Sequence, residues 1–308
     1  MVQGSLRSRS GGRWPSVGRW SAWIALLLVV VVAFTGCDPN QSRSLTLMNE
    51  GVKHYKDNNY GKAAQKLKEA TSEWPENADA HDMLGQIYFS KFDQPDRAIT
   101  HFEAATKHAP EKTAYWYRYG HCLLRMERYP EAEAALNKAV ELEPKHGEAL
   151  YRLAVLSERK GEPVKAAERY GRSIEANART PFAYYNLGDL YFRNEKYDEA
   201  LRVFKNAVEN NPNSAELHHG LGLTYLSLKR PQEALVEFQE ALRLKSVYPS
   251  ALYNLGMTYI ALGNTERAEA HLKEFLKQAP SGDNSARIVA AESRLIEIME
   301  ARREAKAP

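Results

Sequence analysis

The sequence predicts an all-α fold, an α-solenoid of about seven helical hairpins followed by a C-terminal capping helix. Three observations support this prediction. A glycine recurs at intervals close to 34 residues, an alanine follows it by twelve or thirteen residues, and a proline closes most of the intervals. A period of this length is typical of stacked hairpins, because one hairpin cannot bury its own apolar face and neighbours must bury it.

The recurring glycine falls in the first predicted helix of each unit, and the alanine falls in the second. The glycines are Gly51, Gly85, Gly120, Gly188, Gly222 and Gly256, with Ala154 in the fourth unit. The alanines are Ala63, Ala98, Ala132, Ala166, Ala200, Ala234 and Ala268, each followed four residues later by a large apolar residue. We expect the small residues to let the two helices approach closely, while the large residues fill the space around the contact.

Prolines mark where the units end. Five of them stop a second helix, because proline lacks an N–H and clashes with the preceding turn: Pro75, Pro110, Pro144, Pro212 and Pro280. The two remaining units are followed by Pro181 and Pro249, at a position where proline is tolerated as the first helical residue.

This pattern resembles the tetratricopeptide repeat (TPR). The resemblance covers residues 44–282 and defines the repeats 44–77, 78–112, 113–146, 147–180, 181–214, 215–248 and 249–282. It implies a right-handed solenoid whose first helices line a concave groove that binds a protein or peptide segment. Residues 283–308 are predicted to form a capping helix and tail, with Ile288, Ala291, Leu295 and Ile298 or Met299 on one face.

The N-terminus resembles an export signal. Residues 1–36 contain four arginines and then an uncharged apolar run from Trp20 to Gly36. The sequence Phe34-Thr35-Gly36-Cys37 resembles the bacterial lipobox, which implies cleavage before Cys37 and lipidation of that residue. An uncleaved single-pass signal anchor is the alternative. Either interpretation ties the body to a membrane through a short tether, residues 37–43, facing the periplasm, and the sequence does not decide between inner and outer membrane.

A candidate partner-binding surface follows from the first helices, whose exposed places form one helical stripe. In the central repeats this stripe is aromatic and polar: Tyr117, Arg118, Arg125, Tyr151, Arg152, Arg159, Tyr185, Asn186, Asp189 and Arg193. In the last two repeats it is mainly apolar: Leu223, Leu226, Tyr253, Met257 and Ile260. Arg125, Arg159 and Arg193 recur at intervals of 34 and should form a ladder. We predict an arginine-lined centre for carboxylates and an apolar end for a hydrophobic or helical segment, unless the C-terminal helix folds back over that end.

The sequence does not indicate an enzyme. Gly220-Leu221-Gly222 lies inside a predicted helix with no preceding strand, which argues against a nucleotide loop. His218 and His219 are adjacent, so they cannot act as an i,i+4 metal pair. Cys122 is expected to be a buried, unreactive thiol. Residues 37–308 carry a formal charge of −1, so we expect no nucleic-acid partner, and we expect no cofactor and no metal.

The leading functional interpretation is a membrane-anchored scaffold or adaptor that mediates protein–protein interactions in the assembly of a bacterial envelope complex. Lipoproteins of this build resemble factors of pilus secretin assembly or of the cell-wall machinery. The alternatives are an array that associates with copies of itself and an accessory subunit of a periplasmic enzyme.

Overall fold

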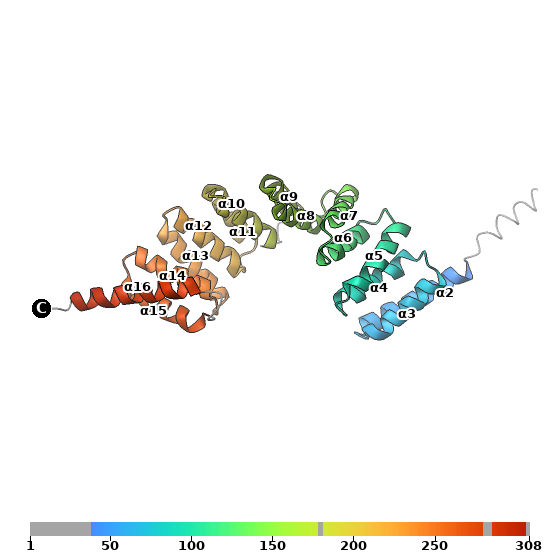
Figure 1. The fold of residues 1–308 in the computed structure, drawn as a ribbon, viewed down its shortest axis with the longest axis horizontal. Coiled ribbons are helices and arrows are strands. Elements are labelled where there is room, and N and C mark those ends of the chain that lie inside the picture. The colour runs from blue at the N-terminus through green and yellow to red at the C-terminus, as the bar shows by residue number, and fades with distance from the viewer. Residues whose placement is uncertain (1–37, 178–180, 280–284, 306–308) are drawn as a thin grey trace, which may run out of the picture. The chain divides into compact units, whose positions relative to one another are not determined.

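The computed structural model describes residues 38–177, 181–279 and 285–305, and within these ranges it contains fifteen helices and no strand. The predicted all-α fold of helical hairpins is therefore confirmed (Figure 1). The predicted signal segment and Cys37 lie outside the described residues. No helix in the described ranges combines the length and the apolar character that a membrane span requires. The chain divides into two compact units between Leu84 and Gly85, inside α4, and each unit is described by itself.

The first unit contains one hairpin, α2 (Pro39–Lys56) and α3 (Tyr60–Glu73), and the first part of α4 (Ala78–Ser90). Its first helix begins five residues before residue 44, so the predicted tether is corrected: residues 39–43 are helical. The physical reason is a local capping signal. The Asp38 carboxylate accepts a hydrogen bond from the backbone N–H of Asn40 at 2.9 Å, and Pro39 occupies the first helical position, where its missing N–H is not needed.

The second unit begins with the end of α4 and with α5 (Pro95–His108), whose Phe102 ring lies 6.3 Å from the ring of Phe89 on α4. Five complete hairpins follow. The hairpins are α6 (Thr113–Arg125) with α7 (Tyr129–Leu142), α8 (Gly147–Arg159) with α9 (Pro163–Ala176), α10 (Pro181–Arg193) with α11 (Tyr197–Asn210), α12 (Ala215–Ser227) with α13 (Pro231–Leu244), and α14 (Pro249–Ala261) with α15 (Thr265–Gln278). In Figure 1 the two helices of each of these pairs lie side by side, joined by a short turn. Each predicted repeat range holds the two helices of one pair, except that α2 begins before residue 44.

The recurring glycine faces a large residue of the second helix. An ideal Cβ on Gly188 would lie 2.6 Å from Cζ of Phe204, and one on Gly222 would lie 2.7 Å from Cε1 of Phe238. Both distances are too short for real atoms, so the absence of a side chain on the first helix makes room for the ring on the second. The two helices approach closely at the glycine, as expected. An ideal Cβ on Gly51 or Gly120 would lie 3.3 Å from the carbonyl oxygen of Ala63 or Ala132, and at each site it would also meet the residue four positions after the alanine.

The turn inside each hairpin contains one residue in the left-handed backbone region. These residues have φ between 52° and 73°: Asn58, Asp93, Glu127, Gly161, Glu195, Lys229 and Gly263. Only two of the seven are glycine, although glycine adopts this conformation without steric cost. Asn58 and Asp93 are of the types that tolerate this region, so the geometry of the turn outweighs a local preference only at Glu127, Glu195 and Lys229.

The C-terminal helix α16 (Ser285–Glu304) packs against α15 and covers the last hairpin (Figure 1). Ala291, Leu295 and Ile298 are buried, and Ile288 packs partly buried against the cluster formed by α14 and α15. Met299 is 45% exposed, so Ile298 is the buried member of the predicted Ile298/Met299 pair.

Candidate functional site

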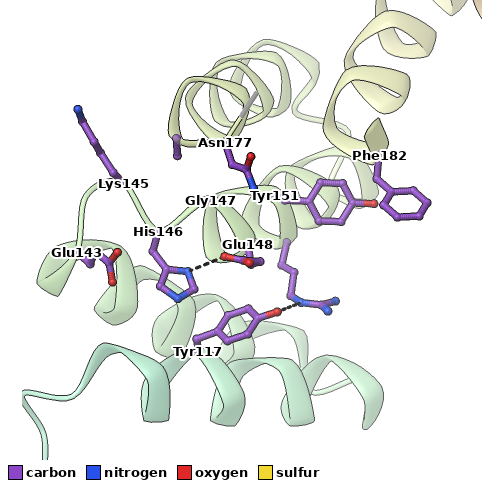
Figure 2. A pocket seen from close by; sticks show the side chains of 11 residues that line it. Tyr117, Glu143, Lys145, His146, Gly147, Glu148, Tyr151, Asn177 and Phe182 are labelled. Atoms are coloured by element: carbon purple, nitrogen blue, oxygen red, sulfur yellow. Dashed lines mark hydrogen bonds and ion pairs between the residues drawn. The ribbon is translucent and has the colours of Figure 1, made fainter. Parts of the chain in front are cut away.

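A cleft of about 490 Å³ lies between the α6/α7 hairpin, the α8/α9 hairpin and the start of α10 (Figure 2). Its volume lies in the range of binding sites for small molecules and single side chains. The residues around it combine aromatic, basic and acidic side chains: Tyr117, Glu143, Lys145, His146, Glu148, Tyr151, Arg152, Asn177 and Phe182. Tyr117, Tyr151 and Arg152 of the predicted stripe line this cleft, and their contact with a partner stays a prediction.

The first helices present these side chains because positions 34 residues apart occupy the same place on successive helices. Tyr117 on α6 and Tyr151 on α8 are one such pair. Between the two helices, His146 precedes α8 and its Nδ1 accepts a hydrogen bond from the backbone N–H of Ala149 at 3.2 Å. This cap holds the imidazole at the cleft, 4.9 Å from the ring of Tyr117 between centroids.

Arg152 is oriented by Tyr117. Its Nε donates to the Tyr117 hydroxyl at 3.2 Å, and its guanidinium carbon lies 5.8 Å from the centre of that ring. Arg152 is half-buried, and among the described residues no carboxylate lies within ion-pair distance of it. The structure therefore places an oriented guanidinium without an ion-pair contact in the wall of the cleft.

A second hollow, of about 270 Å³, shares Tyr117 with the cleft and lies between α4 and α6. It is lined by Gln86, Phe89, Ser90, Phe102, Arg118 and His121 as well as Tyr117. The rings of Phe89 and His121 are 4.9 Å apart between centroids. Burial, together with the nearby charges of Arg152 and Arg125, lowers the pKa of His121 to about 4, so this imidazole is neutral at physiological pH.

The three arginines of the predicted ladder each reach back to the preceding hairpin. Nη2 of Arg125 lies 2.7 Å from Oδ1 of Asp93, and Nη2 of Arg193 lies 2.6 Å from Oε1 of Glu158. Nη1 of Arg159 donates to the hydroxyl of Tyr129 at 2.8 Å. The ladder thus joins neighbouring hairpins, and two of its guanidiniums are already paired with carboxylates of the chain itself. Their contact with a partner stays a prediction.

A hydrogen-bonded network joins α8, α9 and α10 next to Arg193. The buried Tyr170 donates from its hydroxyl to Oε2 of Glu158 at 2.5 Å and accepts from Nδ2 of Asn186 at 3.1 Å. Nδ2 of Asn186 also lies 3.3 Å from the Tyr151 hydroxyl, and Arg193 bonds Asp189 as well as Glu158. Burial and the bond to Glu158 raise the pKa of Tyr170, so its hydroxyl stays protonated. Asn186 and Arg193 therefore join α10 to the preceding hairpin, while Asp189 contacts Arg193 within α10.

The predicted apolar end of the groove is half-buried. Leu223, Leu226 and Ile260 pack against the core cluster that contains Phe238 and Tyr259, and Met257 is likewise half-buried. The ring of Tyr253 is covered on one side by Arg287 of α16, whose guanidinium carbon lies 5.9 Å from the ring centre. Tyr185, by contrast, is 37% exposed. As partner contacts these residues remain predictions.

Sequence reasoning missed the loop residues of the cleft. Glu143, Lys145, His146 and Asn177 lie before or after helices, so they are not part of the helical stripe from which the groove is predicted. The position of His146, immediately before a predicted first helix, was the available signal, because residues that cap successive first helices must line the same side of the stack.

Among the described residues, no group of three or more His, Cys, Asp and Glu side chains could hold a metal ion. The buried Cys122 has its pKa raised to about 11 by burial, and its sulfur lies 3.5 Å from the carbonyl oxygen of Pro95, which makes it a poor nucleophile as expected.

Family models match most of the described chain. Two models described as tetratricopeptide repeat match residues 185–249 and residues 54–116 and 225–295, together more than half of the sequence. A third, described as the middle TPR-like domain of cilia and flagella-associated protein 70, matches residues 92–182. None of the three describes a catalytic domain.

Curated relatives are similar over a small part of their length. A peroxisomal targeting signal receptor from Candida glabrata is 38% identical over 85 residues, which are 28% of this chain and 14% of that protein. The tetratricopeptide repeat-containing protein trd-1 of Caenorhabditis elegans is 27% identical over 107 residues, 34% of this chain and again 14% of the relative. The matched segments thus span about one seventh of these relatives.

Solved structures share the fold. The C-terminal part of a TPR repeat-containing protein from Cytophaga hutchinsonii aligns with a TM-score of 0.65 and 17% identity, covering 80% of this chain and 99% of that one. PilF of Pseudomonas aeruginosa aligns with a TM-score of 0.58 and 19% identity, covering 70% and 97%. YrrB, described as a TPR protein with an unusual peptide-binding site, aligns with a TM-score of 0.51 and 23% identity, covering 62% and 97%.

Proposed function

Because the chain belongs to the tetratricopeptide repeat family, whose members bind proteins and peptides, we propose that it is a membrane-anchored scaffold. Its first-helix face in the second unit binds a segment of a partner protein, and this binding serves the assembly of a bacterial envelope complex. The observation that carries the proposal is the cleft between α6, α8 and α10, where the rings of Tyr117, Tyr151 and Phe182 meet an arginine that has no ion-pair contact.

The side chains of the cleft support a protein partner. Tyrosine and arginine are the residues that most often carry interface energy, and Tyr117, Tyr151 and Arg152 supply both. Phe182 is 69% exposed at the rim, which is unusual for a ring of its size. The peptide-binding site described for YrrB agrees with this use of the fold, and its extension to this chain is part of the proposal.

Photo-crosslinking tests the partner site. We would place a benzophenone amino acid at Phe182 and, as a matched control, at Val236 on α13, which is similarly exposed at 60% but lies on a second helix. Crosslinked protein species in native membranes should form from position 182 and not from position 236. Equal crosslinking from both positions, or none from position 182, would contradict the proposal.

Lipidation of Cys37 is the proposed anchor, and it has its own test. Cells expressing the chain would be labelled with an alkyne fatty acid, and the label should disappear in Cys37→Ser while remaining in Cys122→Ser, which alters a buried thiol. A chain that carries no label but resists extraction from membranes by carbonate would instead support the uncleaved signal anchor.

Self-association is a second candidate function, favoured by one observation on α16. Val289, Ile296 and Met299 are 64%, 55% and 45% exposed on a helix whose other face covers α15. If copies of the chain pair through this stripe, light scattering of the full chain in detergent should show a dimer that Ile296→Glu converts to a monomer. A monomeric parent chain would remove this candidate.

A further inference from the structure

We infer that the two adjoining hollows select a partner segment with a particular pair of side chains: one acidic and one bulky and apolar, two residues apart. The carboxylate pairs with Arg152 in the cleft, and the apolar side chain enters the hollow beside Phe89 and His121. The inference rests on the proposed function and adds to it the chemistry of the partner.

The acidic position follows from how the arginines of this face are used. Arg125 and Arg193 are neutralised by Asp93 and Glu158. Arg152 has only the Tyr117 hydroxyl, bonded at Nε, and its two terminal nitrogens make no hydrogen bond among the described residues. A half-buried charge without a counter-charge favours a ligand that brings one, and the free edge of the guanidinium matches a carboxylate with two parallel hydrogen bonds.

The net charge of the cleft does not explain the preference for an acidic side chain. Glu143 and Glu148 line it together with Lys145 and Arg152, so the four formal charges balance. Glu148 is turned toward His146, whose Nδ1 lies 3.8 Å from its Oε2 (Figure 2). Selection of an acid therefore depends on the orientation of Arg152, and Tyr117 is the positioning residue that holds it.

The apolar position follows from the second hollow. Phe89, Phe102 and Tyr117 supply rings around about 270 Å³, and the neutral His121 adds a fourth ring without a charge. A partner side chain that fills this space would remove apolar surface from water on both molecules, which is the main source of binding energy at protein interfaces.

The spacing follows from Tyr117, which lines both hollows. Alternate side chains of an extended segment point to the same face, and a rise of about 3.3 Å per residue separates them by about 7 Å. This spacing of about 7 Å is close to the distance between two groups that contact the opposite faces of one aromatic ring. An extended segment crossing Tyr117 would therefore insert residues i and i+2, one on either side.

The test uses the full chain in detergent and fluorescent synthetic peptides of twelve residues with amidated ends. Each carries one Phe and one Glu in a Gly/Ser background, two residues apart in either order. Matched peptides replace Glu with Gln, replace Phe with Ala, or separate the pair by five residues. Fluorescence anisotropy should give at least tenfold tighter binding for one of the Glu/Phe peptides than for its Gln counterpart.

Variants of the chain test whether the preference for Glu over Gln peptides comes from the cleft. Arg152→Gln should abolish the difference between Glu and Gln peptides, and Tyr117→Phe should reduce it several-fold while circular dichroism stays unchanged. Arg202→Gln, the same charge change on the exposed face of α11, should leave it intact. One further peptide carries Gln in place of Glu and a free C-terminal carboxylate, so its only carboxylate is the chain terminus. If this peptide binds more tightly than the amidated Glu peptide, the inference of an acidic side chain is overturned.

The inference and the proposed function fail in different ways. If Glu and Gln peptides bind equally, or if Arg202→Gln removes the preference as fully as Arg152→Gln, the inference is overturned while crosslinking at Phe182 can still support the scaffold. If no peptide binds at millimolar concentration, the inference is also overturned. Loss of the Phe182 crosslinks as well would end the proposed function too.

Discussion

Phe204 of α11 occupies the space that a side chain on Gly220 of α12 would need, since an ideal Cβ there would lie 2.5 Å from Cε1 of the ring. An ideal Cβ on Gly188, in the same hairpin as Phe204, would lie 2.6 Å from Cζ of this ring, so Phe204 packs against glycines of its own hairpin and of the next. Gly222 serves Phe238 in the same way. The Gly-x-Gly pattern of α12 is therefore a packing device that faces two hairpins.

Gly220→Ala should destabilise the chain by about 1–3 kcal/mol, because neither the ring nor the helices can move aside without cost. The midpoint of urea unfolding measures this. The matched control is Gly171→Ala in α9, where nothing lies within 4 Å of the added Cβ. Since alanine is the better helix former, that variant should gain about 0.5–1 kcal/mol. Equal effects of the two changes would contradict the packing role of Gly220.

The hairpin turns give a second pair of opposite changes. Gly161 has φ +71°, with no atom near its absent Cβ, so Gly161→Ala should cost about 1 kcal/mol through backbone strain alone. Lys229 has φ +58° in the equivalent turn, and Lys229→Gly should relieve similar strain, offset in part by the greater freedom of glycine in the unfolded chain. Urea midpoints that move in the same direction for both variants would argue against this account.

Stability should fall as the pH drops from about 6.5 toward 4. His219 is 7% exposed, and burial, followed by the charge of Arg287, lowers its pKa to about 4. The unfolded chain takes up a proton in this window that the folded chain excludes, so the contribution is fully present above the unfolded pKa. A shift of this size corresponds to about 3 kcal/mol. Urea unfolding between pH 4 and 7 should therefore give a flatter profile for His219→Gln.

His218 provides the control with the opposite sign. Its Nδ1 lies 2.7 Å from Oε2 of Glu237, which raises the pKa of this imidazole. Its contribution is present below the unfolded pKa and is lost as the pH rises through the folded pKa. Replacement of His218 by Gln should therefore steepen the decline on the acidic side, and a flatter profile would show that the two histidines do not titrate as described.

The network beside Arg193 depends on one hydroxyl. Tyr170→Phe removes the hydrogen bond to the Glu158 carboxylate and the bond from Asn186, and should cost about 1.5–3 kcal/mol because one partner is charged. Tyr151→Phe removes only a 3.3 Å contact with Asn186 and should cost less than about 1 kcal/mol. The difference between the urea unfolding midpoints of the two variants measures how much the Tyr170 hydrogen bonds stabilise the fold. Equal midpoints would show that the network does not stabilise it.

The sequence was most informative where one contact recurs. Gly188 with Phe204 and Gly222 with Phe238 are the same packing solution 34 residues apart, so the periodic pattern predicted the hairpins. It gave no indication that Glu127 and Lys229 adopt positive φ, because the turn imposes that conformation on residues without a preference for it. The periodic pattern does not predict the early start of α2, because the cap by Asp38 and the first helical residue Pro39 lie before the first repeat.

The candidate site was predictable only along the helices. Helical spacing identified Tyr117, Tyr151 and Arg152, but it could not show that Arg125 is bound by Asp93, which lies in a turn with one extra residue. Spacing also cannot separate an exposed apolar residue from one that rests on the neighbouring hairpin, as Leu223 and Ile260 do. Both distinctions depend on contacts between residues that are far apart in sequence.

The capping of α2 by Asp38 leaves a single peptide link between Cys37 and a helix. Consecutive Cα atoms are about 3.8 Å apart. If Cys37 is lipidated, as proposed, the acylated residue would be followed directly by the cap of α2, with no flexible linker of several residues after it. A tilt of the first hairpin would then be coupled directly to movement of the lipid anchor in the bilayer. A glycine-rich insertion after Cys37 would separate the two motions and extend the distance over which the array can sample its surroundings.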